Sequence, residues 1–140
     1  MRAYVLGILI AVGLLLGGKA VLAHHSFAAE FDANKPITIK GIVTKVEWTN
    51  PHAWIHINVK DEATGKVTNW AAEMGPPHGL QRQGWRRDTL KIGEEVTIVG
   101  SRARDGSNHM NARQVTLTST GGRPGETLDA ASSGPPSVDK

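Results

Sequence analysis

The alternation of side chains in residues 53–60 is the strongest constraint on the fold. One row is apolar and consists of Ala53, Ile55, Ile57 and Val59, whereas the other consists of His52, Trp54, His56 and Asn58. A side-chain period of two indicates a β-strand with one buried and one open face. The open face carries two histidines with a tryptophan between them, which makes it the first candidate for a functional surface.

Strands are predicted on both sides of this segment. The pattern is β-like in residues 36–48, 67–74, 96–100 and 112–118. Gly41 interrupts the first of these strands at a change of phase, which predicts a bulge or a tight bend. Asn50-Pro51 is a turn signal, and the loops 61–66 and 104–108 carry the glycines of hairpin turns. Residues 78–85 predict one or two helical turns, with Leu80 and Trp85 seated on a core.

The predicted element order is β-β-β-α-β-β, which gives an all-β fold with one short helix. Three meandering strands, a helix and a closing hairpin are the strand plan of the OB-fold, a small five-stranded Greek-key barrel. An SH3-like barrel and a small sandwich are the alternatives, but neither usually places a helix between the third and fourth strands. We therefore predict a small OB-like barrel.

The two ends of the chain have different compositions from the middle. Arg2, an apolar run and a small-residue site ending at Ala23 predict a signal peptide over residues 1–23. The alternative is an uncleaved anchor, although the run is short for a span of about 20 residues and Lys19 interrupts it. Residues 24–118 are the predicted domain, which begins with an arm over residues 24–35 carrying Phe27 and Phe31. Residues 119–140 are rich in Gly, Pro, Ser and charge and predict a disordered tail.

Charge and composition narrow the class of function. The sixteen Lys and Arg residues fall to fourteen without Arg2 and Lys19, against thirteen acidic residues. An exported domain so close to neutrality lacks the positive field that a nucleic-acid partner requires. We also expect no stable membrane span after signal cleavage. Familiar catalytic motifs are absent and the spacing of the carboxylates selects no reaction, so the prediction is a periplasmic or secreted protein that is not an enzyme.

The predicted mature N-terminus is the best candidate for a metal site. There is no cysteine, so His24, with its free α-amine and its Nδ1, and His25 are the natural ligands. Imidazole and amine nitrogens at an exposed site favour copper. A third nitrogen has to come from elsewhere, and His52 is a better source than His56, which lies about 13 Å further along the strand. Glu73 is expected as a further ligand or as an acceptor for an imidazole N–H, although a shift of one residue in its strand register would turn it to the other face.

The tryptophans suggest a second kind of site. There are four, and flat aromatic surfaces on small barrels bind ligands or partner chains by stacking and by strand addition. Trp54 faces away from the apolar row, so the predicted ligand or partner face consists of Trp54, His56 and Trp48. The alternative is that most of the tryptophans fill the core.

Three segments also carry a resemblance. They are H-H-S-F-A-A-E-F-D from His24, V-T-K-V-E-W-T-N-P-H-A-W ending at Trp54, and G-W-R-R-D-T-L-K-I-G-E-E-V-T-I-V-G from Gly84. The chain is similar, over about residues 24–118, to an uncharacterised family of secreted bacterial domains of unknown function. The resemblance implies an exported single domain and carries no activity with it.

Overall fold

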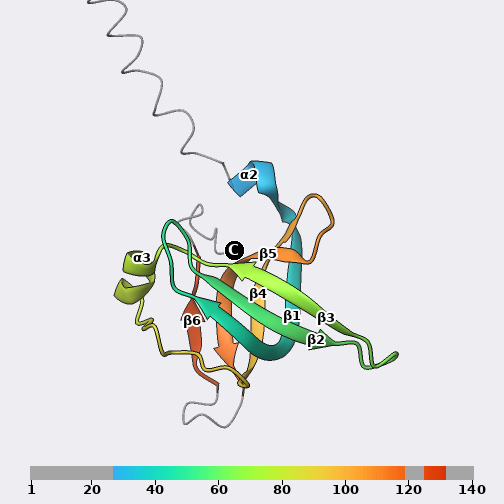
Figure 1. The fold of residues 1–140 in the computed structure, drawn as a ribbon. Coiled ribbons are helices and arrows are strands. Elements are labelled where there is room, and N and C mark those ends of the chain that lie inside the picture. The colour runs from blue at the N-terminus through green and yellow to red at the C-terminus, as the bar shows by residue number, and fades with distance from the viewer. Residues whose placement is uncertain (1–26, 119–124, 132–140) are drawn as a thin grey trace, which may run out of the picture.

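The computed structural model describes residues 27–118 and 125–131 (Figure 1). The predicted signal peptide and the two N-terminal histidines lie outside these ranges. The described elements are α2 (Phe27–Glu30), β1 (Phe31–Glu47), β2 (Trp54–Lys60), β3 (Val67–Glu73), α3 (Pro77–Arg82), β4 (Glu95–Ala103), β5 (His109–Leu117) and β6 (Thr127–Asp129). The fold is therefore all-β with short helices, as predicted.

The strand pairings close into a ring. β1 pairs antiparallel with β2 on one side and with β4 on the other. β2 pairs antiparallel with β3, and β4 with β5. A short parallel ladder between β3 and β5, Ala71–Glu73 with His109–Asn111, joins the two ends. With α3 between the third and fourth strands, this circuit is the OB-like plan that the element order predicted.

The long strand β1 belongs to both sides of the ring, and Gly41 lies next to Ile42, where the two pairings overlap. Residues 31–42 pair with β4, and residues 42–47 pair with β2. A Cβ on Gly41 would run into the carbonyl oxygen of Asn58 on β2. The predicted bulge is not at this glycine, because the register shifts lie between Val43 and Lys45 and between Asp32 and Pro36. Gly41 instead permits the close approach of two backbones.

The inner faces of the strands and α3 form one hydrophobic core. The alternation in residues 53–60 is confirmed: Ala53, Ile55 and Ile57 are fully buried, whereas the side chains between them are partly or fully exposed. α3 contributes Leu80, and Trp85 follows it into the core. None of the helices in the described ranges is long and apolar enough to cross a membrane.

The predicted disordered tail is wrong for residues 125–131. Residues 127–129 form β6, which pairs antiparallel with β5. Leu128 and Ala130 are buried, and the backbone N–H of Gly75 donates to the carbonyl of Ala130. The indole Nε1 of Trp85 donates to the carbonyl of Asp129 at 2.7 Å. Two small apolar side chains and these backbone bonds are enough to fix a short strand, although the composition around them is that of a tail.

The arm at the start of the domain is shorter than predicted. Phe31 and Asp32 already pair with β4, so β1 begins five residues before the predicted strand at Pro36. The spacing of Phe27 and Phe31 suits either a short helical turn or an extended arm, and the structure has the turn, α2, with the two ring centroids 5.7 Å apart. Phe31 is buried and pairs with Ala103, so the pairing of β1 with β4 extends to the end of α2.

Candidate functional site

The outer face of β2, β3 and β5 gathers most of the predicted site residues that the structure describes. Glu73 pairs directly with Trp54 across β2 and β3. Opposite residues of an antiparallel pair share a face, so Glu73 lies on the Trp54 face and the open question of its register is settled. On its other side Glu73 pairs with Asn111 of β5.

His52 and Glu73 form a close pair at the edge of this face. The Nδ1 of His52 lies 2.7 Å from Oε1 of Glu73, and their side chains are 38% and 8% exposed. Burial, and next the nearby carboxylate of Glu30, raise the pKa of Glu73 to about 7. The contact occupies Nδ1 of His52 and leaves Nε2 as the ring nitrogen for another partner.

His56 has a different carboxylate partner. Its Nε2 lies 2.7 Å from Oε2 of Glu47, and Oε1 of Glu47 accepts a hydrogen bond from Lys45 at 2.6 Å. The hydrogen bonds from Lys45 and from His56 lower the pKa of the solvent-exposed Glu47. His52 and His56 are thus held in separate pairs, each with its own carboxylate.

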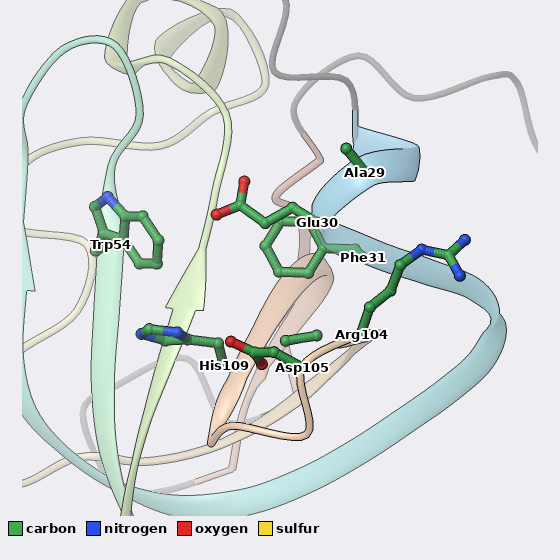
Figure 2. A pocket seen from close by; sticks show the side chains of 8 residues that line it. Ala29, Glu30, Phe31, Trp54, Arg104, Asp105 and His109 are labelled. Carbon is green, nitrogen blue, oxygen red and sulfur yellow. The ribbon is translucent and has the colours of Figure 1, made fainter.

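A cleft of about 440 Å³ opens beside Trp54 (Figure 2). It lies between α2 with the start of β1 on one side and the β4–β5 hairpin on the other. Its lining residues are Ala29, Glu30, Phe31, Trp54, Ala103, Arg104, Asp105 and His109. The rings of Trp54 and His109 meet with their centroids 5.9 Å apart. The cleft therefore has an aromatic wall contributed by strands that are distant in the sequence.

The charged side chains around the cleft do not all face it. Figure 2 shows the Glu30 carboxylate on the side of Phe31 that faces Trp54, and the Asp105 carboxylate next to His109. The guanidinium of Arg104 points away, where its Nε donates to the carbonyl of Ala28 at 2.8 Å and Nη1 lies 3.7 Å from Asp32. The charge presented to the cleft by these side chains is therefore negative.

The lining of the cleft does not include all of the predicted site residues that the structure describes. Trp48 packs against the hydrophobic core and is not among the residues that line the cleft. His24 and His25 lie outside the described ranges, so their contacts are not part of this picture. Within residues 27–118 and 125–131, no three His, Cys, Asp or Glu side chains are grouped as a set of metal ligands.

The cleft includes residues that were not among the predicted site residues. Glu30, Asp105 and His109 come from α2, the β4–β5 hairpin and the start of β5. Their proximity to Trp54 depends on the parallel pairing of β3 with β5, for which no local pattern exists. His109 next to a hairpin turn was the one available signal.

Comparison with known proteins gives a family and no activity. No curated protein and no solved structure gives a significant match. Residues 12–112 match the model of a family described as "Family of unknown function (DUF6152)". The match spans most of the chain and includes the N-P-H-A-W segment, and it confirms the resemblance to an uncharacterised domain family. The chain belongs to this family of unknown function.

Proposed function

We propose that the protein is an exported binding module that holds a transition-metal ion, copper in the first instance. Its ligands are His24, through amine and imidazole, His25 and His52, with Glu73 in support. The observation that carries the proposal is the 2.7 Å contact between Nδ1 of His52 and Oε1 of Glu73. The role is binding and not catalysis.

The His52–Glu73 pair has the form of a metal-binding imidazole with its supporting carboxylate. Histidine ligands commonly donate their second ring N–H to a carboxylate, which fixes the tautomer and orients the ring. The Glu73 side chain is nearly buried and His52 is more than a third exposed. This difference suits Glu73 as the orienting acceptor and His52 as the ligand through Nε2.

The helical turn that follows the proposed N-terminal ligands in the sequence approaches the His52–Glu73 pair. Glu30, the last residue of α2, lies close enough to the Glu73 carboxyl group to raise its pKa, so the end of α2 faces the His52–Glu73 pair. His24 precedes Phe27 by three residues, which keeps its Cα within about 11 Å of the Phe27 Cα. An α-amine with a pKa near 8 and an adjacent imidazole form a chelate that favours copper over the other divalent metals.

The test is a Cu²⁺ titration, in competition with a chelator, of two forms of the protein. One begins at His24 and the other carries a single glycine before it. We expect one tightly bound ion in the first form and about tenfold or greater weakening in the second, because the extension removes the amine from the chelate. Equal affinity in both forms would contradict the N-terminal chelate.

Two histidine variants separate the contribution of the barrel from that of the N-terminus. His52→Asn should weaken binding and alter the electron paramagnetic resonance spectrum of the bound Cu²⁺. His78→Asn is the matched control, because His78 is exposed on α3 and is not part of the proposed site. An unchanged spectrum in His52→Asn would exclude His52 as a ligand and leave at most a site formed by the N-terminus alone.

The Trp54 cleft supports a second candidate function, the binding of a small non-metal ligand. The observation in its favour is the volume of about 440 Å³ beside a half-buried tryptophan, which is within the usual range for small-molecule sites. The indole Nε1–H signal of Trp54 reports entry of a ligand. Trp54→Ala should abolish binding while the far-ultraviolet circular dichroism stays unchanged.

A further inference from the structure

The Trp54 cleft combines aromatic rings with carboxylates, and this combination selects a class of ligand. Trp54 and Phe31 contribute rings, and Glu30 and Asp105 contribute negative charge (Figure 2). We propose that the cleft binds a small organic cation, an ammonium group carried on a short aliphatic chain. This inference rests on the second function proposed above and is independent of the metal site.

The aromatic wall provides the surface on which an ammonium group is stabilised. Trp54 is half-buried, so part of its ring remains open to the cleft while its position is fixed by β2 and by the contact with His109. Tryptophan is the best partner for a cation among the aromatic side chains because its ring face is the most negative. Phe31 is 2% exposed, so it is a fixed part of the wall.

Glu30 supplies a charge that no described side chain neutralises. Its side chain is exposed and faces the cleft, and among residues 27–118 and 125–131 it forms no ion pair. Its backbone carbonyl is engaged separately, accepting from the N–H of Arg104 at 3.0 Å. The carboxylate is thus available to a cation that rests against Trp54.

Asp105 adds a second negative charge in a fixed position. Its Oδ1 accepts from the Ser107 hydroxyl at 2.6 Å and from the Ser107 backbone N–H at 2.9 Å. These bonds, the hydroxyl first, lower the pKa of Asp105 and keep it ionised. Ser107 Oγ also lies 3.4 Å from Nδ1 of His109, which links the acid to the ring that contacts Trp54.

The cation among the lining side chains is turned away from the cleft. Arg104 donates through Nε to the carbonyl of Ala28 and lies near Asp32, so its guanidinium faces the outer side of α2 and β1. An anionic ligand would therefore meet two carboxylates and no opposed positive charge. A neutral apolar ligand would leave the Glu30 carboxylate partly desolvated without a partner, which costs free energy.

The experiment compares choline with 3,3-dimethylbutan-1-ol, a neutral molecule of the same shape in which carbon replaces the quaternary nitrogen. Nuclear magnetic resonance of the full processed chain follows the Trp54 indole and the His109 ring during each titration. We expect saturable shifts with choline and about tenfold or greater weakening with the alcohol, which corresponds to the upper part of the range for cation–π contacts. Equal binding of the two molecules would overturn the inference and leave the cleft as an apolar ligand site.

Variants identify the residues that recognise the cation. Glu30→Gln should weaken choline binding about threefold or more, and Trp54→Leu should abolish the saturable shift of His109. Glu62→Gln is the matched control, because Glu62 is an exposed carboxylate in the β2–β3 loop and should leave the affinity unchanged. Wild-type affinity in Glu30→Gln, retained binding in Trp54→Leu, or the absence of any shift in the wild type would each overturn the proposal. Melting curves verify that every variant is folded.

Discussion

The Nδ1 of His52 lies 2.7 Å from Oε1 of Glu73, and the histidine is the more exposed partner of the two. The contact joins the turn before β2 to the end of β3, on the face opposite the core. It holds a nearly buried carboxyl group whose pKa is raised to about 7, first by burial and then by Glu30. This relationship makes the stability of the barrel sensitive to pH.

Glu73→Gln should change the pH dependence of unfolding. The folded-state pKa of Glu73 is above its unfolded value of 4.5, so its contribution is fully present below about pH 4.5 and is lost as the pH rises through about 7. The substituted glutamine side chain cannot ionise, so the variant should gain stability relative to the wild type across this window, by up to about 3 kcal/mol. Urea unfolding at intervals from pH 4 to pH 8 measures the difference.

Glu47→Gln is the control for this experiment. Glu47 also contacts a histidine, but it is solvent-exposed and its pKa is lowered by Lys45 and His56. Its contribution is therefore present above the unfolded pKa and is lost as the pH falls, which is the opposite sign. A Glu73→Gln difference that stays flat between pH 5 and pH 7 would show that the Glu73 pKa is not raised.

Gly41→Ala should destabilise the fold. The added Cβ runs into the carbonyl oxygen of Asn58, so β1 and β2 have to separate where β1 passes from β4 to β2. We expect a loss of about 1–3 kcal/mol in the free energy of unfolding, as for other overpacked sites. Gly79→Ala in α3 is the matched control, because its Cβ would meet only ordinary contacts with Pro76 at 3.5 Å and alanine favours the helix. Equal effects at the two glycines would contradict the close approach.

Leu128→Ala should show that β6 belongs to the fold. Leu128 is 9% exposed and is part of the core cluster, so its truncation should lower the free energy of unfolding by about 2 kcal/mol or more. Ile92→Ala also shortens an aliphatic side chain, but Ile92 is 74% exposed and the change should stay within about 0.5 kcal/mol. Chemical denaturation of the two variants side by side is the measurement, and indistinguishable curves would mean that β6 is dispensable.

Trp85→Phe should weaken the attachment of β6 to the rest of the fold. The change removes the hydrogen bond from Nε1 to the carbonyl of Asp129 and leaves that carbonyl without its indole donor. We expect a loss of about 1–3 kcal/mol together with faster amide exchange in residues 127–130. Trp54→Phe is the same chemical change at a half-buried position outside the core cluster, and it should cost clearly less.

The strands could be predicted because their side chains alternate, and the helix because residues 78–85 lie between two strand patterns and carry Leu80 and Trp85 at a spacing that suits a core. The face on which Glu73 lies depended on hairpin register, which one residue can reverse, and only the pairing with Trp54 decides it. β6 was missed because three residues within a Gly- and Pro-rich segment carry too little periodicity. What stabilises β6 is contact with β5 and Trp85, both remote in the sequence.

The candidate sites also contain residues that could be predicted from the sequence and residues that could not. His52, Trp54 and Glu73 could be named from the sequence because the chemistry of their side chains and their phase in the strands are local properties. The contact of Trp54 with His109 follows from the pairing of β3 with β5, and the effect of Glu30 on the pKa of Glu73 follows from the position of α2. Contacts between residues so distant in the sequence leave no periodic pattern from which they could be predicted.

The ring is closed between β3 and β5 by three residue pairs, which include His109 and the Glu73 that pairs with Trp54. Because this ladder is short, we expect local opening of the barrel to occur between β3 and β5. The hydrogen bond from the Ala71 amide to the carbonyl of Asn108 should be among the first to break. A ligand that contacts the rings of both Trp54 and His109 would stabilise the pairing of β3 with β5. Slower hydrogen exchange at the Ala71 amide would then report occupancy of the cleft without any label on the ligand.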